Sequence, residues 1–243
     1  MSVPTQTEYQ RTLSIIVPVL NERNHIESLI EDLANSGAEQ IIVVDGGSRD
    51  GTFDWLYKHW QSPDTGQVLI ESMPGRARQM NAGARAAEGD MLLFLHADSK
   101  LPMGAKQDVI EAREKQHLWG RFDVAFNTAP GTNWQMKIIA LFMNIRSRLT
   151  SIATGDQAIF VDSILFRSIG AYPDIPLMED IAISSSLRRH SVPHCSKLKV
   201  STSARRWQQR GVVKTVILMW YLRLAYFCRA DPRRLAKLYR ELR

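Results

Sequence analysis

The first hundred residues of this 243-residue chain alternate between strand-like and helix-like segments, and this alternation constrains the fold more than any other feature. Four apolar runs, LSIIVPVL, QIIVVD, QVLIES and DMLLFLHAD, are separated by segments with helical periodicity. Runs that are apolar throughout and rich in Val and Ile are typical of strands buried on both faces. Their order predicts an α/β fold with a doubly wound, mostly parallel (mixed) central sheet and helices on both faces.

No repeat or linker divides the chain, so we expect a single domain over residues 1–243. It begins with a flexible arm (1–11) and ends with a basic helical extension (201–243). The formal net charge of +6 belongs to this extension, because eleven Lys and Arg residues from Arg205 onward face only two acidic residues. Such a tail can contact nucleic acid, anionic lipid or a polyphosphate ligand.

The extension contains an apolar helical segment, 212–227, whose environment the sequence leaves open. Lys214 and Arg223 interrupt it, and a membrane-spanning helix needs about 20 residues. Burial against the domain is one interpretation. Contact with a membrane interface through Trp220 and Tyr221 is a second, and a homodimer contact is a third.

Cysteine content and the amino terminus indicate the compartment. The two cysteines, Cys195 and Cys228, are too few for a disulfide framework. The amino terminus has no apolar run of the kind found in secretory signals. We therefore expect a cytoplasmic protein, located at the inner face of the membrane if segment 212–227 contacts lipid.

Polar residues follow the four predicted strands, in PVLNE, VDGGSRDG, PGRARQMNAG and HADS. In an open α/β sheet, ligands bind outside the carboxyl ends of the strands. The second of these loops lacks both GxGxxG and GxxxxGK, which argues against a dinucleotide site or a P-loop. The sequence therefore predicts a different kind of binding site along this edge.

Two carboxylates and a histidine at this edge have identifiable chemistry. Asp45 can accept a hydrogen bond from a base N–H, or it can cap the turn that follows. Asp98 suits Mg²⁺ or Mn²⁺ shared with substrate phosphates, with capping as the alternative. His96 can contact such a metal or a ribose hydroxyl.

Basic residues begin the third helix-like segment. Arg76 and Arg78 lie where a helix amino terminus already favours anions, and Asn81 follows one turn later. They can bind phosphate, or they can form a solvated basic face.

The segments IIVPVLNE, IIVVDGGSRDGT, NAGARAAEGDMLLFLHADS and LMEDIAI resemble, in this order and spacing, the family-two inverting glycosyltransferases of the GT-A fold. The resemblance covers roughly residues 12–190. It implies a nucleotide-binding half (12–100) and an acceptor-binding half (101–200). The segments GRARQMNAGA, LHADS and RRW are similar to those of a small bacterial subgroup of this family. Some members of that subgroup are associated with arsenosugar biosynthesis.

The resemblance implies specific roles along the edge. The donor, a UDP- or GDP-type nucleotide-diphosphate sugar, is expected to contact Pro18, Asn21, Glu22, Asp45, Gly46, Arg76, Arg78, Asn81, His96, Ala97 and Asp98. Asp98 is the implied ligand of Mn²⁺ or Mg²⁺. Two positions depart from the family pattern, because His96 replaces the first Asp of DxD and Gly46 replaces the second acid of DDGS.

The second half supplies the implied chemistry. Glu179 and Asp180 match the catalytic pair, with Asp180 as the general base for an unidentified acceptor hydroxyl. As first-turn acids of a helix they also have a plain structural explanation. SARRWQQRG is similar to the QxxRW segment of processive members, which places Arg206 on the leaving diphosphate and Trp207 beneath the acceptor. The alternative is the start of an amphipathic helix, with Trp207 packed in the core. Asp156 is expected on the acceptor side.

Two other functions fit parts of the sequence. A sugar-phosphate nucleotidyltransferase would need a glycine-rich loop after the first strand, where this chain has PVLNERNH. A non-enzymatic nucleic-acid or polyphosphate-binding module could use the basic carboxyl end. The acidic residues at the strand edge would repel nucleic acid, so we expect no nucleic-acid partner.

Overall fold

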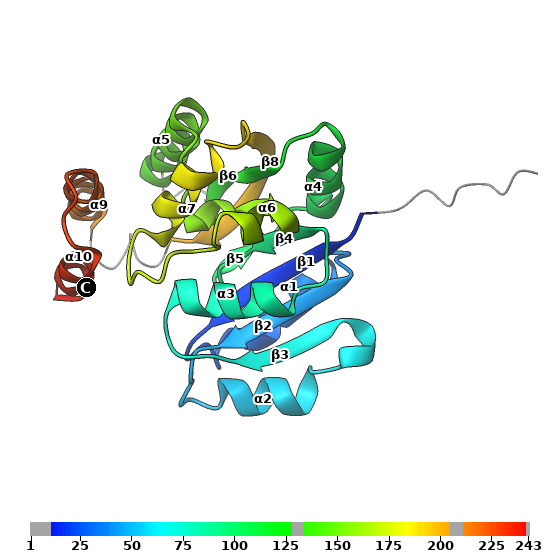
Figure 1. The fold of residues 1–243 in the computed structure, drawn as a ribbon. Coiled ribbons are helices and arrows are strands. Elements are labelled where there is room, and N and C mark those ends of the chain that lie inside the picture. The colour runs from blue at the N-terminus through cyan, green and yellow to red at the C-terminus, as the bar shows by residue number, and fades with distance from the viewer. Residues whose placement is uncertain (1–10, 128–133, 205–210, 242–243) are drawn as a thin grey trace, which may run out of the picture.

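The computed structural model describes residues 11–127, 134–204 and 211–241 (Figure 1). The predicted arm therefore lies almost wholly outside the described residues. Within these ranges a central sheet carries helices on both faces, and α9 and α10 lie beyond it at the carboxyl end.

The sheet has eight strands in the order β3-β2-β1-β4-β7-β6-β8-β5. The strands are β1 Leu13–Val19, β2 Gln40–Asp45, β3 Gln67–Glu71, β4 Met91–Phe94, β5 Ser99–Lys100, β6 Trp119–Asn127, β7 Phe160–Asp162 and β8 His194–Ser203. The first four strands pair in parallel, whereas β7 runs antiparallel to both β4 and β6. The predicted mixed α/β architecture is confirmed.

Helices fill the connections. They are α1 Ile26–Ala34, α2 Thr52–His59, α3 Arg76–Ala86, α4 Ala105–Glu114, α5 Trp134–Thr150, α6 Ser163–Ser168, α7 Glu179–Leu187, α9 Val212–Phe227 and α10 Pro232–Glu241. Two short 3₁₀ turns, η1 Pro63–Thr65 and η2 Gly155–Gln157, complete the set.

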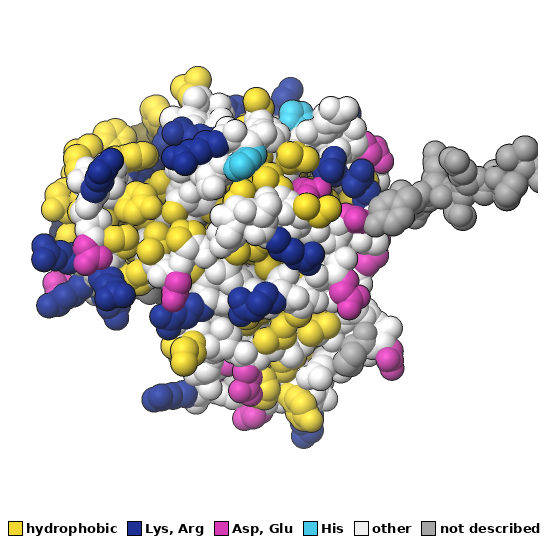
Figure 2. All heavy atoms as spheres, viewed as in Figure 1, with side chains coloured by type: hydrophobic (Ala, Val, Ile, Leu, Met, Phe, Trp, Pro, Cys, Tyr) yellow, Lys and Arg dark blue, Asp and Glu magenta, His cyan; other side chains and the backbone are white. Residues whose placement is uncertain are grey.

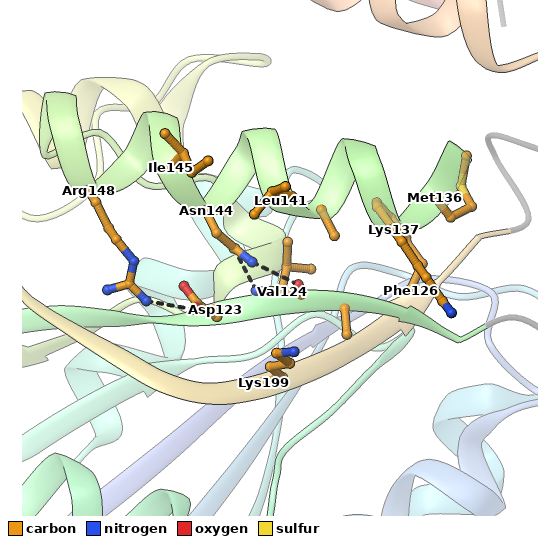
Figure 3. A pocket seen from close by; sticks show the side chains of 12 residues that line it. Asp123, Val124, Phe126, Met136, Lys137, Leu141, Asn144, Ile145, Arg148 and Lys199 are labelled. Carbon is orange, nitrogen blue, oxygen red and sulfur yellow. Dashed lines mark hydrogen bonds and ion pairs between the residues drawn. The ribbon is translucent and has the colours of Figure 1, made fainter. Parts of the chain in front are cut away.

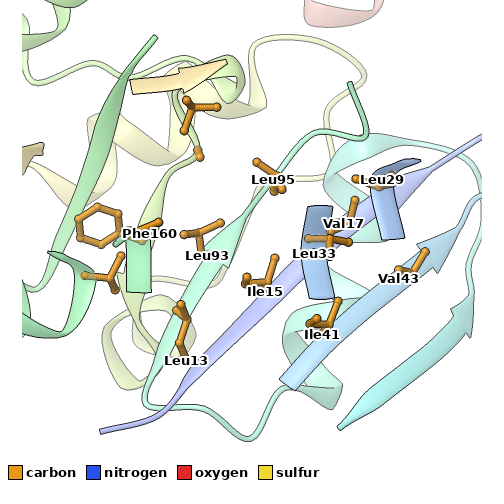
Figure 4. Packing of buried hydrophobic residues seen from close by; sticks show 14 of the residues in the cluster. Leu13, Ile15, Val17, Leu29, Leu33, Ile41, Val43, Leu93, Leu95 and Phe160 are labelled. Atoms are coloured by element: carbon orange, nitrogen blue, oxygen red, sulfur yellow. The ribbon is translucent and has the colours of Figure 1, made fainter. Parts of the chain in front are cut away.

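The packing of strand β1 explains why its sequence is apolar throughout. Ile15 and Val17 point into a core shared with α1, α2 and α4, and Figure 4 shows them beside Leu29 and Leu33 of α1. Ile16, between them, points into a second core shared with α3, α6 and α7. Alternate side chains of a strand face opposite sides of the sheet, so both faces of β1 are buried.

One predicted strand is shorter than expected. The run DMLLFLHAD forms a strand only to Phe94, and an irregular segment carries the rest of it. Later in the chain, the apolar run DQAIFV begins in η2 and forms a strand only from Phe160. An unpredicted helix, α6, starts there because the Asp162 carboxylate accepts hydrogen bonds from the amides of Ile164 and Leu165 at 3.0 Å each.

Helix α9 has one buried face and one exposed face. Leu222 packs with Ile152, Met178 and Ile181 next to the start of α7. The opposite face exposes large apolar side chains, namely Ile217, Trp220, Tyr221, Leu224 and Phe227. Apolar side chains also gather over this part of the surface in Figure 2. No helix in the described ranges is long and apolar enough to cross a membrane.

Candidate active site

The carboxyl ends of β1, β2 and β4 lie next to each other at one edge of the sheet, as the sequence predicts. The Gly46 amide donates to the Val19 carbonyl at 2.9 Å. The buried Gln79 side chain of α3 donates from Nε2 to the carbonyls of Val19 and Val44, at 2.8 and 2.9 Å. Gln79 therefore joins both strand ends to α3, a role that the sequence analysis missed.

Asp45 caps the turn that follows β2. It is 1% exposed, and one carboxylate oxygen accepts the amides of Gly47 and Ser48 at 2.8 Å each. The Ser48 hydroxyl donates to its other oxygen and in turn accepts the amide of Asn21 at 2.8 Å. The structural alternative for Asp45 is thus realised, and its contact with a base stays a prediction.

The β1 loop is organised in the same way. The Asn21 side chain accepts the amide of Arg49 at 2.9 Å, and the Glu22 amide donates to Thr52 Oγ1 at 2.9 Å. Pro18 is half-buried within β1, beside Val44 in the register. These polar groups hold the β1 and β2 loops together, which gives the edge a fixed shape.

The turn η2 brings three predicted residues together. His96 Nδ1 lies 3.3 Å from an Asp156 carboxylate oxygen. The Gly155 amide donates to Asp180 Oδ2 at 3.0 Å, and Asp180 Oδ1 accepts the amide of Ile181 at 2.8 Å. One turn of 3₁₀ helix thus links the end of β4 to the start of α7.

Gly155 is required for this arrangement. A Cβ at this position would lie 2.3 Å from both Cε1 and Nε2 of His96. The histidine ring therefore packs directly on the glycine backbone, and no other residue fits without moving the ring.

Buried charge dominates the region around Glu179. Burial, and then the adjacent Asp180 carboxylate, raise the pKa of Glu179, while Arg76 and His96 act in the opposite direction. Arg76 is exposed at the start of α3, and against partial loss of solvation of the guanidinium its acidic neighbours Glu179, Asp156 and Asp180 raise its pKa. The predicted pair Glu179–Asp180 and the predicted Arg76 therefore form one electrostatic unit.

Two other predicted donor residues have structural partners outside this unit. Arg78 Nε donates to Asp174 at 2.9 Å, and both side chains are exposed. The Asn81 side chain exchanges hydrogen bonds with the backbone of Tyr172 at 2.8 and 3.0 Å. The structure places these two residues against the 172–174 segment, and their contact with a donor stays a prediction.

Asp98 has free coordinating capacity. It is half-buried beside Ala97, and in the described chain its carboxylate accepts one long hydrogen bond, from Ser99 Oγ at 3.5 Å. Within the described parts of the chain, no group of three or more His, Cys, Asp and Glu side chains is arranged to hold a metal. Mg²⁺ and Mn²⁺ often use one or two carboxylates and take their other oxygens from substrate phosphates and water, so Asp98 fits such a cation.

The predicted diphosphate and acceptor contacts of Arg206 and Trp207 lie outside the described residues.

Two half-buried arginines that the sequence did not single out as site residues are electrostatic neighbours of Asp180. They are Arg146 of α5 and Arg223 of α9. Burial, and then Arg223, lower the pKa of Arg146 to about 10, while Asp180 opposes this change. Burial also lowers the pKa of Arg223, against the influence of Asp180 and Asp156. No local pattern in the sequence brings these two side chains together.

A separate cavity of about 590 Å³ lies between α5 and the strands β6 and β8 (Figure 3). Asn144 bridges helix and strand there, accepting the Val124 amide at 2.9 Å and donating to its carbonyl at 3.1 Å. Arg148 lies at one end, where it pairs with Asp123 at 2.6 Å. No predicted site residue lines this cavity, so we keep the active-site assignment at the strand edge.

Sequence comparison identifies relatives of the chain. The family model described as glycosyl transferase family 2 matches residues 14–167. A PGL/p-HBAD biosynthesis glycosyltransferase of Mycobacterium bovis is 36% identical over 93 residues, which make up 36% of each chain. An undecaprenyl-phosphate 4-deoxy-4-formamido-L-arabinose transferase of Pseudomonas syringae is 26% identical over 153 residues, 59% of this chain and 44% of that protein. The matches therefore span less than half of either relative's length.

Solved structures share the fold. The mannosyltransferase PcManGT from Pyrobaculum calidifontis, in complex with GDP-Man and Mn²⁺, superimposes with a TM-score of 0.62 at 19% identity, over 90% of this chain and 62% of that one. S. aureus TarS in complex with UDP-GlcNAc superimposes with a TM-score of 0.61 at 17% identity, over 80% and 59%. At these identities the likeness establishes the fold alone.

Proposed function

The chain belongs to glycosyl transferase family 2, and from this premise we propose that it is a glycosyltransferase with an inverting, metal-dependent mechanism. It moves a sugar from a nucleotide-diphosphate sugar to an acceptor hydroxyl. One observation carries the proposal: η2 holds the Asp180 carboxylate beside His96 and Asp156 at the edge where the parallel strands end. Ligands of open α/β sheets bind at this edge.

The donor is proposed to bind along the loops after β1, β2 and β4. The capped Asp45 turn and the hydrogen bond between Asn21 and Ser48 hold the loops after β1 and β2 in a fixed arrangement. Arg76 begins α3, where the positive end of the helix favours a diphosphate. The complexes of PcManGT with GDP-Man and of TarS with UDP-GlcNAc favour a nucleotide-sugar donor.

Asp98 is the residue proposed to hold Mn²⁺ or Mg²⁺. When bound, the cation would neutralise charge on the diphosphate leaving group. Arg76, whose acidic neighbours are Glu179, Asp156 and Asp180, would contribute a second positive charge on the donor side. His96 lies beside Asp156 at the same strand edge, and its contact with a ribose hydroxyl is part of the proposal.

Asp180 is the proposed general base. Its two oxygens accept the amides of Gly155 and Ile181, which fixes the carboxylate orientation. An inverting transfer is a single displacement in which this carboxylate takes the proton of the attacking hydroxyl. Glu179 is buried behind it, so its part is to position Asp180 and Arg76 and not to touch substrate.

Nucleotide binding tests the donor assignment. We expect UDP or GDP to raise the melting temperature more with Mn²⁺ than without it, because a diphosphate and the Asp98 carboxylate can share one cation. Calorimetry should then show that Asp98→Ala removes the metal-dependent part of the affinity. Asp64→Ala is the matched control, since this exposed acid lies in η1, before β3 and away from the strand ends. Equal metal-dependent affinity in Asp98→Ala would remove this residue from the site.

A further inference from the structure

Arg146 is a half-buried cation with two buried, unpaired nitrogen atoms among the described residues. Its Nε and Nη2 atoms are inaccessible and make no hydrogen bond within the part of the chain that the structure describes. It lies in the last turns of α5, the helix that leads into the segment carrying Asp156. A guanidinium offers five donors, and leaving buried donors unpaired is destabilising.

Arg223 approaches the same place from α9. The neighbouring Leu222 is fully buried against Ile152, Met178 and Ile181, which anchors α9 at the start of α7. Arg223 also has no ion pair within the described ranges, and its electrostatic neighbours are Asp180 and Asp156. The two arginines are close enough to repel each other.

Two like charges at one partly buried place need a counter-charge. Asp180 supplies a negative charge to both arginines and Asp156 supplies a second one to Arg223, but the oxygens of Asp180 already accept two backbone amides. Arginine forks suit bidentate binding of phosphate oxygens. A dianionic phosphate would match the two guanidiniums in charge and would fill their free donors.

From this arrangement we propose that Arg146 and Arg223 form an anion site for the acceptor, which carries a phosphate group in addition to its attacking hydroxyl. The proposal rests on the assignment of Asp180 as general base. Arg146 and Arg223 border Asp180 from α5 and α9, whereas the donor loops follow β1, β2 and β4. A phosphate group held between these arginines would orient the hydroxyl of the same acceptor molecule toward the Asp180 carboxylate.

The phosphate can come from a soluble metabolite or from a lipid headgroup. Exposed apolar side chains on both helices, including Leu141 and Phe142 of α5 and Trp220 and Leu224 of α9, make a lipid source reasonable. The two sources share the same recognition chemistry, and the experiment separates them.

Glycerol 3-phosphate is the soluble probe, because it carries both a hydroxyl and a phosphate. We titrate it calorimetrically into the full chain saturated with UDP and Mg²⁺. Arg146→Gln and Arg223→Gln should each weaken its binding at least about tenfold, the change expected for a lost charge-assisted hydrogen bond. UDP affinity should stay within about twofold. Arg148→Gln on α5 and Lys214→Gln on α9 remove the same charge from the same helices and should leave binding unchanged.

Vesicles containing phosphatidylglycerol form the second arm. A lipid source gives binding that falls in Arg146→Gln and Arg223→Gln but not in Lys214→Gln, while glycerol 3-phosphate binds weakly. Arginine-dependent binding in either arm supports the site and identifies the source. The melting temperature should stay level or rise in Arg146→Met, because an unpaired buried charge is removed, whereas a purely structural arginine would lower it.

Three results would overturn the proposal. They are no binding in either arm, binding that both arginine variants leave unchanged, and a parallel loss of UDP affinity in both variants, which would assign the arginines to the donor diphosphate. Failure of the wild-type chain to bind UDP with metal would instead reject the proposed function, and the phosphate titration without UDP would still report on the arginine site.

Discussion

Gly155→Ala should displace His96 and uncouple it from Asp156. The new Cβ would lie 2.3 Å from the ring, whereas 3.4 Å begins ordinary contact, so the ring has to move by about 1.1 Å. His96 is 9% exposed and packed on its other sides, so this movement strains its surroundings. Overpacking of this kind typically costs about 1–3 kcal/mol. The backbone of Gly155 is not left-handed, so the clash is the whole effect.

Urea denaturation of a double-mutant cycle measures this cost. Gly155→Ala should lower the free energy of unfolding by about 1–3 kcal/mol in the wild-type chain and by little in the His96→Ala background. Gly104→Ala is the control, since nothing lies within 4 Å of its Cβ position but its φ is +78°. It should cost about 1–2 kcal/mol in both backgrounds. Additive effects of Gly155→Ala and His96→Ala would refute the contact.

Two further predictions concern the acidic pair. Asp180→Asn should keep UDP affinity but lower transfer at least about a hundredfold, measured as nucleoside diphosphate release once an acceptor is known; near wild-type turnover would reject the general base. Because the pKa of Glu179 is raised, the folded chain binds the proton of this carboxyl more tightly than the unfolded chain does. The free energy of unfolding therefore falls as the pH rises from about 4.3, the pKa of an unperturbed Glu, through the raised pKa of Glu179. Glu179→Gln should therefore raise the melting temperature at pH 7 and leave it almost unchanged at pH 4, and an equal effect at both would contradict the assignment.

The parts of the fold that could be predicted are those encoded locally. The runs LSIIVPV and QIIVVD form strands with almost the expected bounds, and VVKTVILMWYLRLAYF forms one helix. Their periodicity is a property of neighbouring residues, so one sequence suffices. The start of α6 was not predicted because it depends on one residue. The carboxylate of Asp162, which follows the apolar run, accepts the first amides of the helix and so caps it.

The candidate site could be predicted in part from strand ends, but not where it depends on tertiary contact. Asp98 lies at the predicted edge with oxygens that a ligand could reach, whereas Asp180 begins α7 and was expected at the site only from the family resemblance. Asp45 lies there too, but three hydrogen bonds from its own turn occupy its carboxylate. The meeting of Arg146 with Arg223 depends on how α5 and α9 pack, which no local pattern records.

Gly46 illustrates how one departure from a family pattern can be explained by a distant residue. The GT-A resemblance places an acid at this position, and its Cβ would lie 2.9 Å from the amide group of Gln79. That amide cannot swing away freely, because it donates to the carbonyls at the ends of β1 and β2. Gln79 thus performs from α3 a linking function that leaves no room for a side chain at 46. The two residues form one unit, so the missing acid reflects a different way of fixing the strand ends and not the loss of the site.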